Sequence, residues 1–210
     1  MAAVLALSLA AITLPASAQG LFGPGKFRVE QSDDRFSTTG LTTRSGVNNR
    51  VTKKSAGGAL YIDWRGLYLD PAVSKNRDTG KVSSVGFLLH HETYAFAGIG
   101  AGNELGLPQR VSFLLPGGRI IRADVQNADV KVGEGDGYNR YTGVAPPNIR
   151  EAGTLTLSLE DMAAVANAPS VTINVEGSKQ SWTIEAKDVS KTFLPNLAKF
   201  YAEEIAPVAG

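Results

Sequence analysis

The stretch from Val171 to Lys187 constrains the fold of this chain more than any other, because its pattern predicts a β-hairpin. In VTINVEGSKQSWTIEAK, apolar residues alternate with polar ones before and after Gly177-Ser178, which is the period of a strand with one wet face. A two-residue turn at Gly177-Ser178, with glycine supplying a positive φ, predicts a register in which Glu176 faces Lys179. This register separates the two faces: Ile173 meets Trp182 and Val171 meets Ile184 on one, Asn174 meets Ser181 and Thr172 meets Thr183 on the other.

Two helices are expected beside this hairpin, since a lone hairpin is marginal in water and needs a cover for its apolar face. Ser158 and Asp161 have the spacing of a capping box, so a helix should begin at Leu159, and Asn167 should end it. A second helix should run from Pro195 to Ile205, because proline is favoured at the first helical position.

The rest of the chain is dominated by strand patterns, and nothing alternates strands with helices at βαβ spacing. Val82 to Ala97 is the longest strand-like run, and a second hairpin is expected around Pro116-Gly117-Gly118. Three further segments complete the prediction: a strand from Leu60 to Arg65, a turn at Asp70-Pro71, and a long loop or loosely paired edge over residues 37–58.

We therefore predict an α+β fold that is mainly antiparallel β. A β-sandwich-like sheet domain should cover residues 19–150, and residues 151–210 should form a helix–hairpin–helix unit packed on the same core. The length of the chain favours one domain, or one domain with an appended unit.

Residues 1–18 have the pattern of a secretory signal peptide. The run AAVLALSLAAITLPASA is apolar and uncharged and ends in the small-residue site Ala16-Ser17-Ala18, so cleavage would leave Gln19 first. The basic residue that usually precedes such a run is missing, which fits a start upstream of Met1 or a role for the N-terminal amine. A buried N-terminal helix is the alternative interpretation. We expect a periplasmic or secreted protein with no transmembrane span in the mature chain, since no other apolar run approaches about 18 residues.

The composition excludes several classes of site and partner. The chain has no cysteine, so it has no disulfide, no thiolate nucleophile and no cysteine-bound zinc or iron–sulfur centre. Its 21 basic and 20 acidic residues nearly cancel, which leaves a net charge of +1 and no broad positive field for nucleic acid. An exported chain without disulfides must be held together by packing, and this length is sufficient for a good core.

The motifs of metal binding and catalysis are weak or missing. His90-His91-Glu92 is the only histidine cluster, and adjacent residues of a strand point to opposite faces, so we predict no metal site and no cofactor. The glycines from Gly98 to Gly102 lack the spacing of a dinucleotide-binding loop, and there is no G-x-S-x-G or S-x-x-K motif. A serine triad with His90 or His91 as its base is an alternative whose other members the sequence does not identify.

The most ligand-like cluster consists of Tyr138, Asn139, Arg140 and Tyr141, in a glycine-rich stretch. Tyrosine and arginine carry binding energy when they are desolvated, so these four residues are the predicted binding patch for a protein, peptide or carbohydrate partner. The simpler alternative places one tyrosine in the core and the rest on the surface. We expect a non-enzymatic exported binding or accessory protein; the alternative is an exported hydrolase whose site is assembled from scattered residues.

Overall fold

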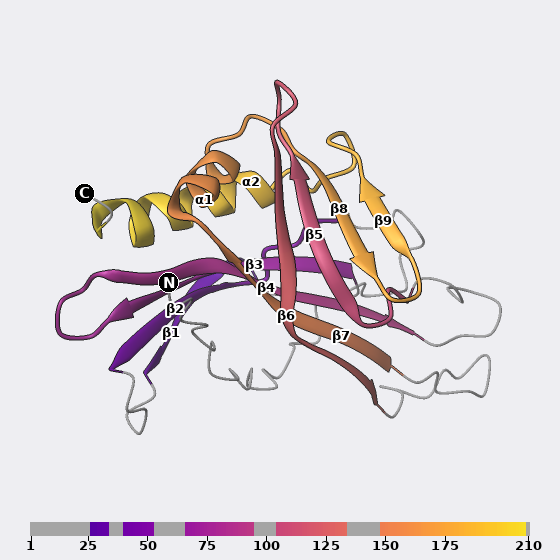
Figure 1. The fold of residues 1–210 in the computed structure, drawn as a ribbon, viewed down its shortest axis with the longest axis horizontal. Helices are drawn as coiled ribbons and strands as arrows, with labels where there is room; N and C mark the ends of the chain where they lie inside the picture. The colour runs from indigo at the N-terminus through magenta and orange to yellow at the C-terminus, as the bar shows by residue number, and fades with distance from the viewer. Residues whose placement is uncertain (1–25, 34–39, 53–65, 95–103, 134–147, 209–210) are drawn as a thin grey trace, which may run out of the picture.

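The computed structural model describes residues 26–33, 40–52, 66–94, 104–133 and 148–208 (Figure 1). In these residues the chain is mostly antiparallel β-sheet with few helices, which confirms the predicted α+β class with mainly antiparallel β structure. The strands are β1 (Arg28–Asp33), β2 (Leu41–Val47), β3 (Gly66–Asn76), β4 (Val82–Tyr94), β5 (Pro108–Leu114), β6 (Ile120–Gly133), β7 (Asn148–Leu157), β8 (Thr172–Gly177) and β9 (Ser181–Ile184).

The nine strands form one hydrogen-bonded sheet in the order β1-β2-β3-β4-β7-β6-β5-β8-β9. Strands β1 to β4 follow each other as a meander, after which β7 pairs with β4 and β8 pairs with β5. Figure 1 shows two arms: β1 to β4 and β7 run across the lower part of the view, whereas β5, β8 and β9 rise from it. The sheet is therefore sharply bent rather than flat.

The long strand β6 joins the two arms because its halves pair with different neighbours. Residues 120–124 pair with β5, and residues 125–133 pair with β7. The register with β7 shifts beside Asn127, whose φ is +50°, which is a β-bulge that bends the strand. Gly153 of β7 lies against this bend, and a Cβ there would approach Val125 Cγ1 to 2.2 Å. A side chain at this position of β7 would therefore displace Val125.

The bent sheet brings the segment after β2 into contact with the segment after β9. The segment after β2 continues beside β3, and Thr52 then pairs with Val189, which follows β9. The Ser190 N–H donates to the Val51 carbonyl at 2.7 Å. A short bridge therefore joins the segment between β2 and β3 to the segment that follows β9.

Two helices, α1 (Leu159–Ala166) and α2 (Phe193–Phe200), lie in the angle between the arms (Figure 1). α2 continues as a π-helical turn (Tyr201–Ile205) and a 3-10 turn (Ala206–Val208). Its side chains Phe193, Leu197 and Phe200 are completely buried, in one hydrophobic core with Met162 of α1 and with the strands. No helix of the described residues is long and apolar enough to cross a bilayer.

The predicted start of α1 is confirmed. The Ser158 hydroxyl accepts a hydrogen bond from the Asp161 N–H at 3.0 Å, and Asn167 caps the other end. The second helix begins at Phe193, before the predicted Pro195, and its regular α-helical part ends at Phe200.

The hairpin of β8 and β9 forms, but its predicted register is wrong by two residues. Glu176 pairs with Ser181 instead of Lys179. The turn is longer because the N–H groups of Ser178 and Lys179 donate to backbone carbonyls just before β5, both at 2.9 Å. A shift of two residues keeps every side chain on its predicted face. The observed pairs are Ile173 with Ile184, Asn174 with Thr183 and Val175 with Trp182.

Two other predictions are wrong: the long loop or loosely paired edge over residues 37–58, as far as residues 40–52 are described, and the turn at Asp70-Pro71. β2 falls in the first and pairs with both β1 and β3, so it is an interior strand of the sheet. Asp70 and Pro71 lie inside β3. Proline is tolerated there because the ladder with β2 ends at Ala72, and Asn48, with a φ of +69°, interrupts the neighbouring chain.

The remaining predictions have mixed outcomes. The turn at Pro116-Gly117-Gly118 is confirmed, with the Leu115 N–H donating to the Arg119 carbonyl at 2.9 Å. The longest predicted strand corresponds to β4. The predicted strand from Leu60 to Arg65 lies outside the described residues. The division at residue 150 stays a prediction, and β7 runs across that position.

Candidate functional site

His91 and Glu151 form a buried polar pair on the core side of the sheet. His91 of β4 and Glu151 of β7 lie directly opposite each other, which brings their side chains together. His91 Nδ1 lies 2.7 Å from Glu151 Oε2, and the two side chains are 4% and 1% exposed. The half-buried Trp182 of β9 packs edge-to-face with the imidazole, at 4.6 Å between ring centroids.

The Glu151 carboxylate also holds the segment that leads into β5. The Leu105 N–H donates to Oε2 at 3.0 Å, and the Gly106 N–H donates to Oε1 at 2.6 Å. Together with His91, these groups surround both carboxylate oxygens, and hydrogen bonds to a charged acceptor are the strong ones. Glu151 therefore acts as a clamp between β4, β7 and the start of β5.

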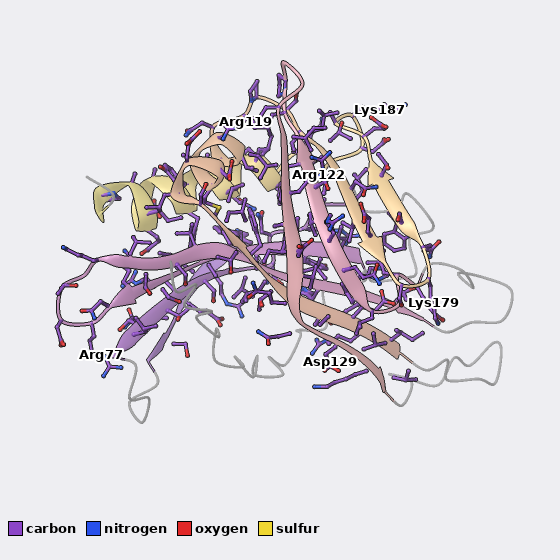
Figure 2. The ribbon with its side chains drawn as sticks, in the orientation of Figure 1. Arg77, Arg119, Arg122, Asp129, Lys179 and Lys187 are labelled. Atoms are coloured by element: carbon purple, nitrogen blue, oxygen red, sulfur yellow. The ribbon has the colours of Figure 1, made fainter. Side chains whose placement is uncertain are left out.

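The turn between β8 and β9 extends this network. Lys179, at the tip of the turn in Figure 2, forms an ion pair with Glu104, and Gln180 donates to the Glu104 carbonyl at 2.8 Å. A Cβ at Gly177 would lie 2.2 Å from the Leu105 carbonyl oxygen, so glycine permits this close approach. The β8–β9 turn and the segment before β5 are thus fixed to each other.

We call this part of the molecule the clamp end: the Glu151 clamp together with the ends of β3, β4, β6 and β7. Gly66, the first residue of β3, pairs with Glu92 of β4. Asn148, the first residue of β7, pairs with Tyr94 of β4 on one side and with Gly133 of β6 on the other. Four strands therefore terminate at the same end of the sheet.

His90 and Asp70 form a second polar pair, on the opposite face of the sheet. His90 stacks on Tyr68, with 4.4 Å between ring centroids and 10° between ring planes. Its Nδ1 lies 3.5 Å from Asp70 Oδ2 and has no hydrogen-bond partner. The other oxygen of Asp70 accepts the Asn49 N–H at 2.6 Å.

Burial favours the uncharged form of both groups. Desolvation raises the pKa of the Asp70 carboxyl to about 7, although the Asn49 N–H acts in the other direction. Desolvation, together with the positive charge of Arg150, lowers the pKa of His90 to about 3. A general base works best with a pKa near the operating pH, so His90 is poorly suited to that role.

The histidine cluster His90-His91-Glu92 does not converge on one point. His90 and His91 serve different faces, and Glu92 accepts from Arg150, with Nη2 and Oε1 at 2.6 Å. Among the residues that the structure describes, no group of three or more histidine or acidic side chains could hold a metal ion.

Comparisons of the chain with protein-family models, with curated protein sequences and with solved structures found no match.

The predicted binding patch of Tyr138, Asn139, Arg140 and Tyr141 lies outside the described residues, so it stays a prediction.

The sequence interpretation missed Glu151 as the partner of His91. The signal is present in the alternation of β7, where Ile149, Glu151 and Leu155 share the buried face, so an acid lies among apolar residues. His91 follows Phe87 on the buried face of β4 in the same way. A polar side chain at an apolar position of a strand needs a hydrogen-bond partner, and these two residues supply each other with one.

Proposed function

We propose that this protein is an exported, non-enzymatic binding or accessory protein that holds its partner at the clamp end. The observation that carries the proposal is the clamp, in which Glu151 ties His91 and the start of β5 into one unit. Binding residues are commonly found on loops that a rigid scaffold positions. The clamp end has the properties of such a scaffold.

The connection between β6 and β7 supplies the proposed binding residues. Residues 134–147 join Gly133 to Asn148, which pair with each other at the clamp end. Tyr138, Asn139, Arg140 and Tyr141 belong to this connection, and their types suit a protein, peptide or carbohydrate partner. A net charge of +1 argues against nucleic acid.

The alternative, an exported hydrolase, has less support because its candidate bases are engaged in the fold. His91 is 4% exposed, and its Nδ1 is bonded to a carboxylate that also accepts two backbone N–H groups. The pKa of His90, lowered to about 3, makes that imidazole a weak base at neutral pH.

Export and the finer description of the fold belong to the same proposal. The signal-peptide pattern of residues 1–18 supports secretion to the periplasm or beyond, with cleavage after Ala18. The sandwich-like packing and the C-terminal helix–hairpin–helix unit are supported by a shared core, since α1, β8, β9 and α2 follow each other and contribute to one cluster.

The test compares Tyr138→Ala/Arg140→Ala with the wild-type chain. Both are immobilised and exposed to periplasmic extract and to a glycan array, and retained species are identified by mass spectrometry. We expect the wild type to retain a defined ligand that the double variant loses, at an unchanged melting temperature. Arg122→Ala is the matched control, since Arg122 is exposed on the half of β6 remote from Gly133 (Figure 2).

A hydrolase would give the opposite pattern. Turnover of a generic ester, glycoside or peptide substrate that His90→Ala or His91→Ala abolishes, with the double variant fully active, would replace the binding function with catalysis.

A further inference from the structure

The second half of β6 has no strand beside its outer edge within the described part of the chain. β5 accompanies β6 only as far as Asp124, which pairs with Arg110, whereas residues 125–133 pair with β7 on the other side. Among the strands that the structure describes, none pairs with the outer edge of residues 129–133. Alternate backbone N–H and C=O groups of this edge are therefore not used by any strand of the described residues, and they have the geometry to pair with a further strand.

Two valines and one ion pair mark this edge. Val130 and Val132 are 38% and 68% exposed, which is unusual for valines in a strand. They alternate with Asp129 and Lys131, whose charged atoms lie 3.1 Å apart on the other face of the strand. Figure 2 shows Asp129 on the lower part of β6, away from the β5–β6 turn. The edge is thus apolar on one face and charged on the other.

We propose that residues 128–132 pair with the same residues of a second copy of this chain, antiparallel, about a two-fold axis at Val130. In this register Asp129 lies opposite Lys131 of the second copy, and each Val132 lies opposite an Ala128. Opposite charges and apolar pairs directly across an antiparallel ladder are stabilising. Because both copies use the same surface, this isologous interface closes into a dimer and does not extend into a larger assembly.

Other registers lose this complementarity. An axis at Lys131 places two lysines opposite each other, and an axis at Asp129 does the same with two aspartates. A shift of one residue puts the valines of the two copies on different faces of the joint sheet. The sequence ADVKV from Ala128 to Val132 is self-complementary in one antiparallel register.

Lysines and bulges on strand edges also serve to prevent pairing, and β6 has both Lys131 and the bulge at Asn127. The two roles make opposite predictions. A protecting lysine opposes association, so replacing it promotes pairing. In the proposed register Lys131 promotes association, because it meets Asp129 of the second copy.

The first test is sedimentation equilibrium at low salt over about 1 µM to 1 mM, a range that covers weak dimers. We expect the wild-type chain to form a dimer. In Lys131→Glu the dissociation constant of the dimer should be at least about tenfold larger, because the two attractive pairs between residues 129 and 131 of the two copies become repulsive. The swap Asp129→Lys/Lys131→Glu should restore the wild-type constant. Lys81→Glu, on the β3–β4 turn, is the control for net charge. Because the Asp129–Lys131 pair is exposed, these changes should leave the melting temperature nearly unchanged.

A wild-type chain that stays monomeric, a Lys131→Glu dimer of unchanged or greater strength, or a swap that fails to restore association would each overturn the proposal.

The second test uses the absence of cysteine from the chain. The two-fold axis brings the two copies of residue 130 face to face, so Val130→Cys should form an intermolecular disulfide rapidly under mild oxidation. Val132→Cys faces Ala128 of the second copy and should form the disulfide at least about tenfold more slowly. Equal rates for the two variants would contradict the register. This readout is independent of ligand binding at the clamp end.

Discussion

The arrangement of His90 and Asp70 favours the uncharged form of both side chains. Asp70 Oδ2 lies 3.5 Å from His90 Nδ1, which has no hydrogen-bond partner. A protonated carboxyl can donate to a neutral imidazole nitrogen, whereas two buried charges would each cost desolvation energy. The raised pKa of Asp70 and the lowered pKa of His90 therefore favour the same neutral arrangement.

The two shifts have opposite effects on stability as pH changes. The pKa of Asp70 rises from 3.8 to about 7 on folding, so its contribution is complete at low pH and is lost as pH rises through about 7. The pKa of His90 falls from 6.5 to about 3, so its contribution is present above pH 6.5 and is lost as pH falls towards 3. Between pH 3.8 and pH 6.5 the two effects on the free energy of unfolding oppose each other, so they cancel in the wild-type chain.

Replacing Asp70 or His90 should reveal the pH dependence of stability that the other residue causes. Relative to the wild type, Asp70→Asn should make stability rise more steeply with pH between about 4 and 6.5, and His90→Gln should make it rise less steeply or fall. Each difference in slope should approach about 1.4 kcal/mol per pH unit. Urea unfolding at several pH values measures the slopes. If stability changed with pH in the same way in the two variants and the wild type, the pKa values of Asp70 and His90 would not be shifted as described.

The buried polar residues could be recognised from the sequence only in part. The alternation of β7 marks Glu151 as an acid on the apolar face, and the alternation of β4 does the same for His91. Their pairing could not be read, because the two residues are 60 positions apart and no local pattern indicates that β7 inserts next to β4.

Individual elements were predictable where their signals are local. The Ser158 cap and the Pro116-Gly117-Gly118 turn depend on neighbouring residues and were found. The β8–β9 register was missed because carbonyls before β5 bind the turn, which no local rule contains. β2 was missed because its polar side chains give no apolar alternation, although it pairs on both sides.

The clamp at Glu151 should be worth several hydrogen bonds, because it connects β4, β7 and the start of β5. In Glu151→Gln the amide NH₂ replaces one of the two acceptor oxygens, and each of these oxygens accepts a backbone N–H, from Leu105 or from Gly106. We expect the free energy of unfolding to fall by about 3 kcal/mol, as for other buried charged partners. Urea unfolding at pH 7 measures the loss.

The matched control for this variant is Glu160→Gln. Its side chain is 82% exposed, so the same chemical change should cost no more than about 0.5 kcal/mol. Similar losses for the two variants would mean that Glu151 does not act as a clamp.

The stability of the whole fold depends on the C-terminal segment that contains α2. A chain that ends at Thr192 lacks four completely buried side chains, Phe193, Leu197, Phe200 and Ile205. Burial of each is worth about 2 kcal/mol, so their sum is comparable to the stability of a whole domain. We expect the truncated chain to have no cooperative unfolding transition and no near-ultraviolet circular dichroism.

A peptide of residues 190–210 should restore both signals when it is added to the truncated chain. The same peptide with Phe193→Ala and Phe200→Ala should not, because it lacks the two largest of these side chains. Cooperative unfolding of the truncated chain alone would show that the sheet is stable without α2.

The contact between Thr52 and Val189 joins residues far apart in the sequence, so these two segments of the sheet cannot meet until nearly the whole chain is available. Contacts of this range require loop closure before they return any energy, and folding slows as their share increases. The hairpins among β1 to β4 are local and can form much earlier. For the exported protein that we propose, a chain that crosses a membrane with its N-terminus first cannot complete its sheet while β9 is still on the other side. The bridge that completes the structure therefore also sets the order of its assembly, with the last residues to arrive closing the first strands.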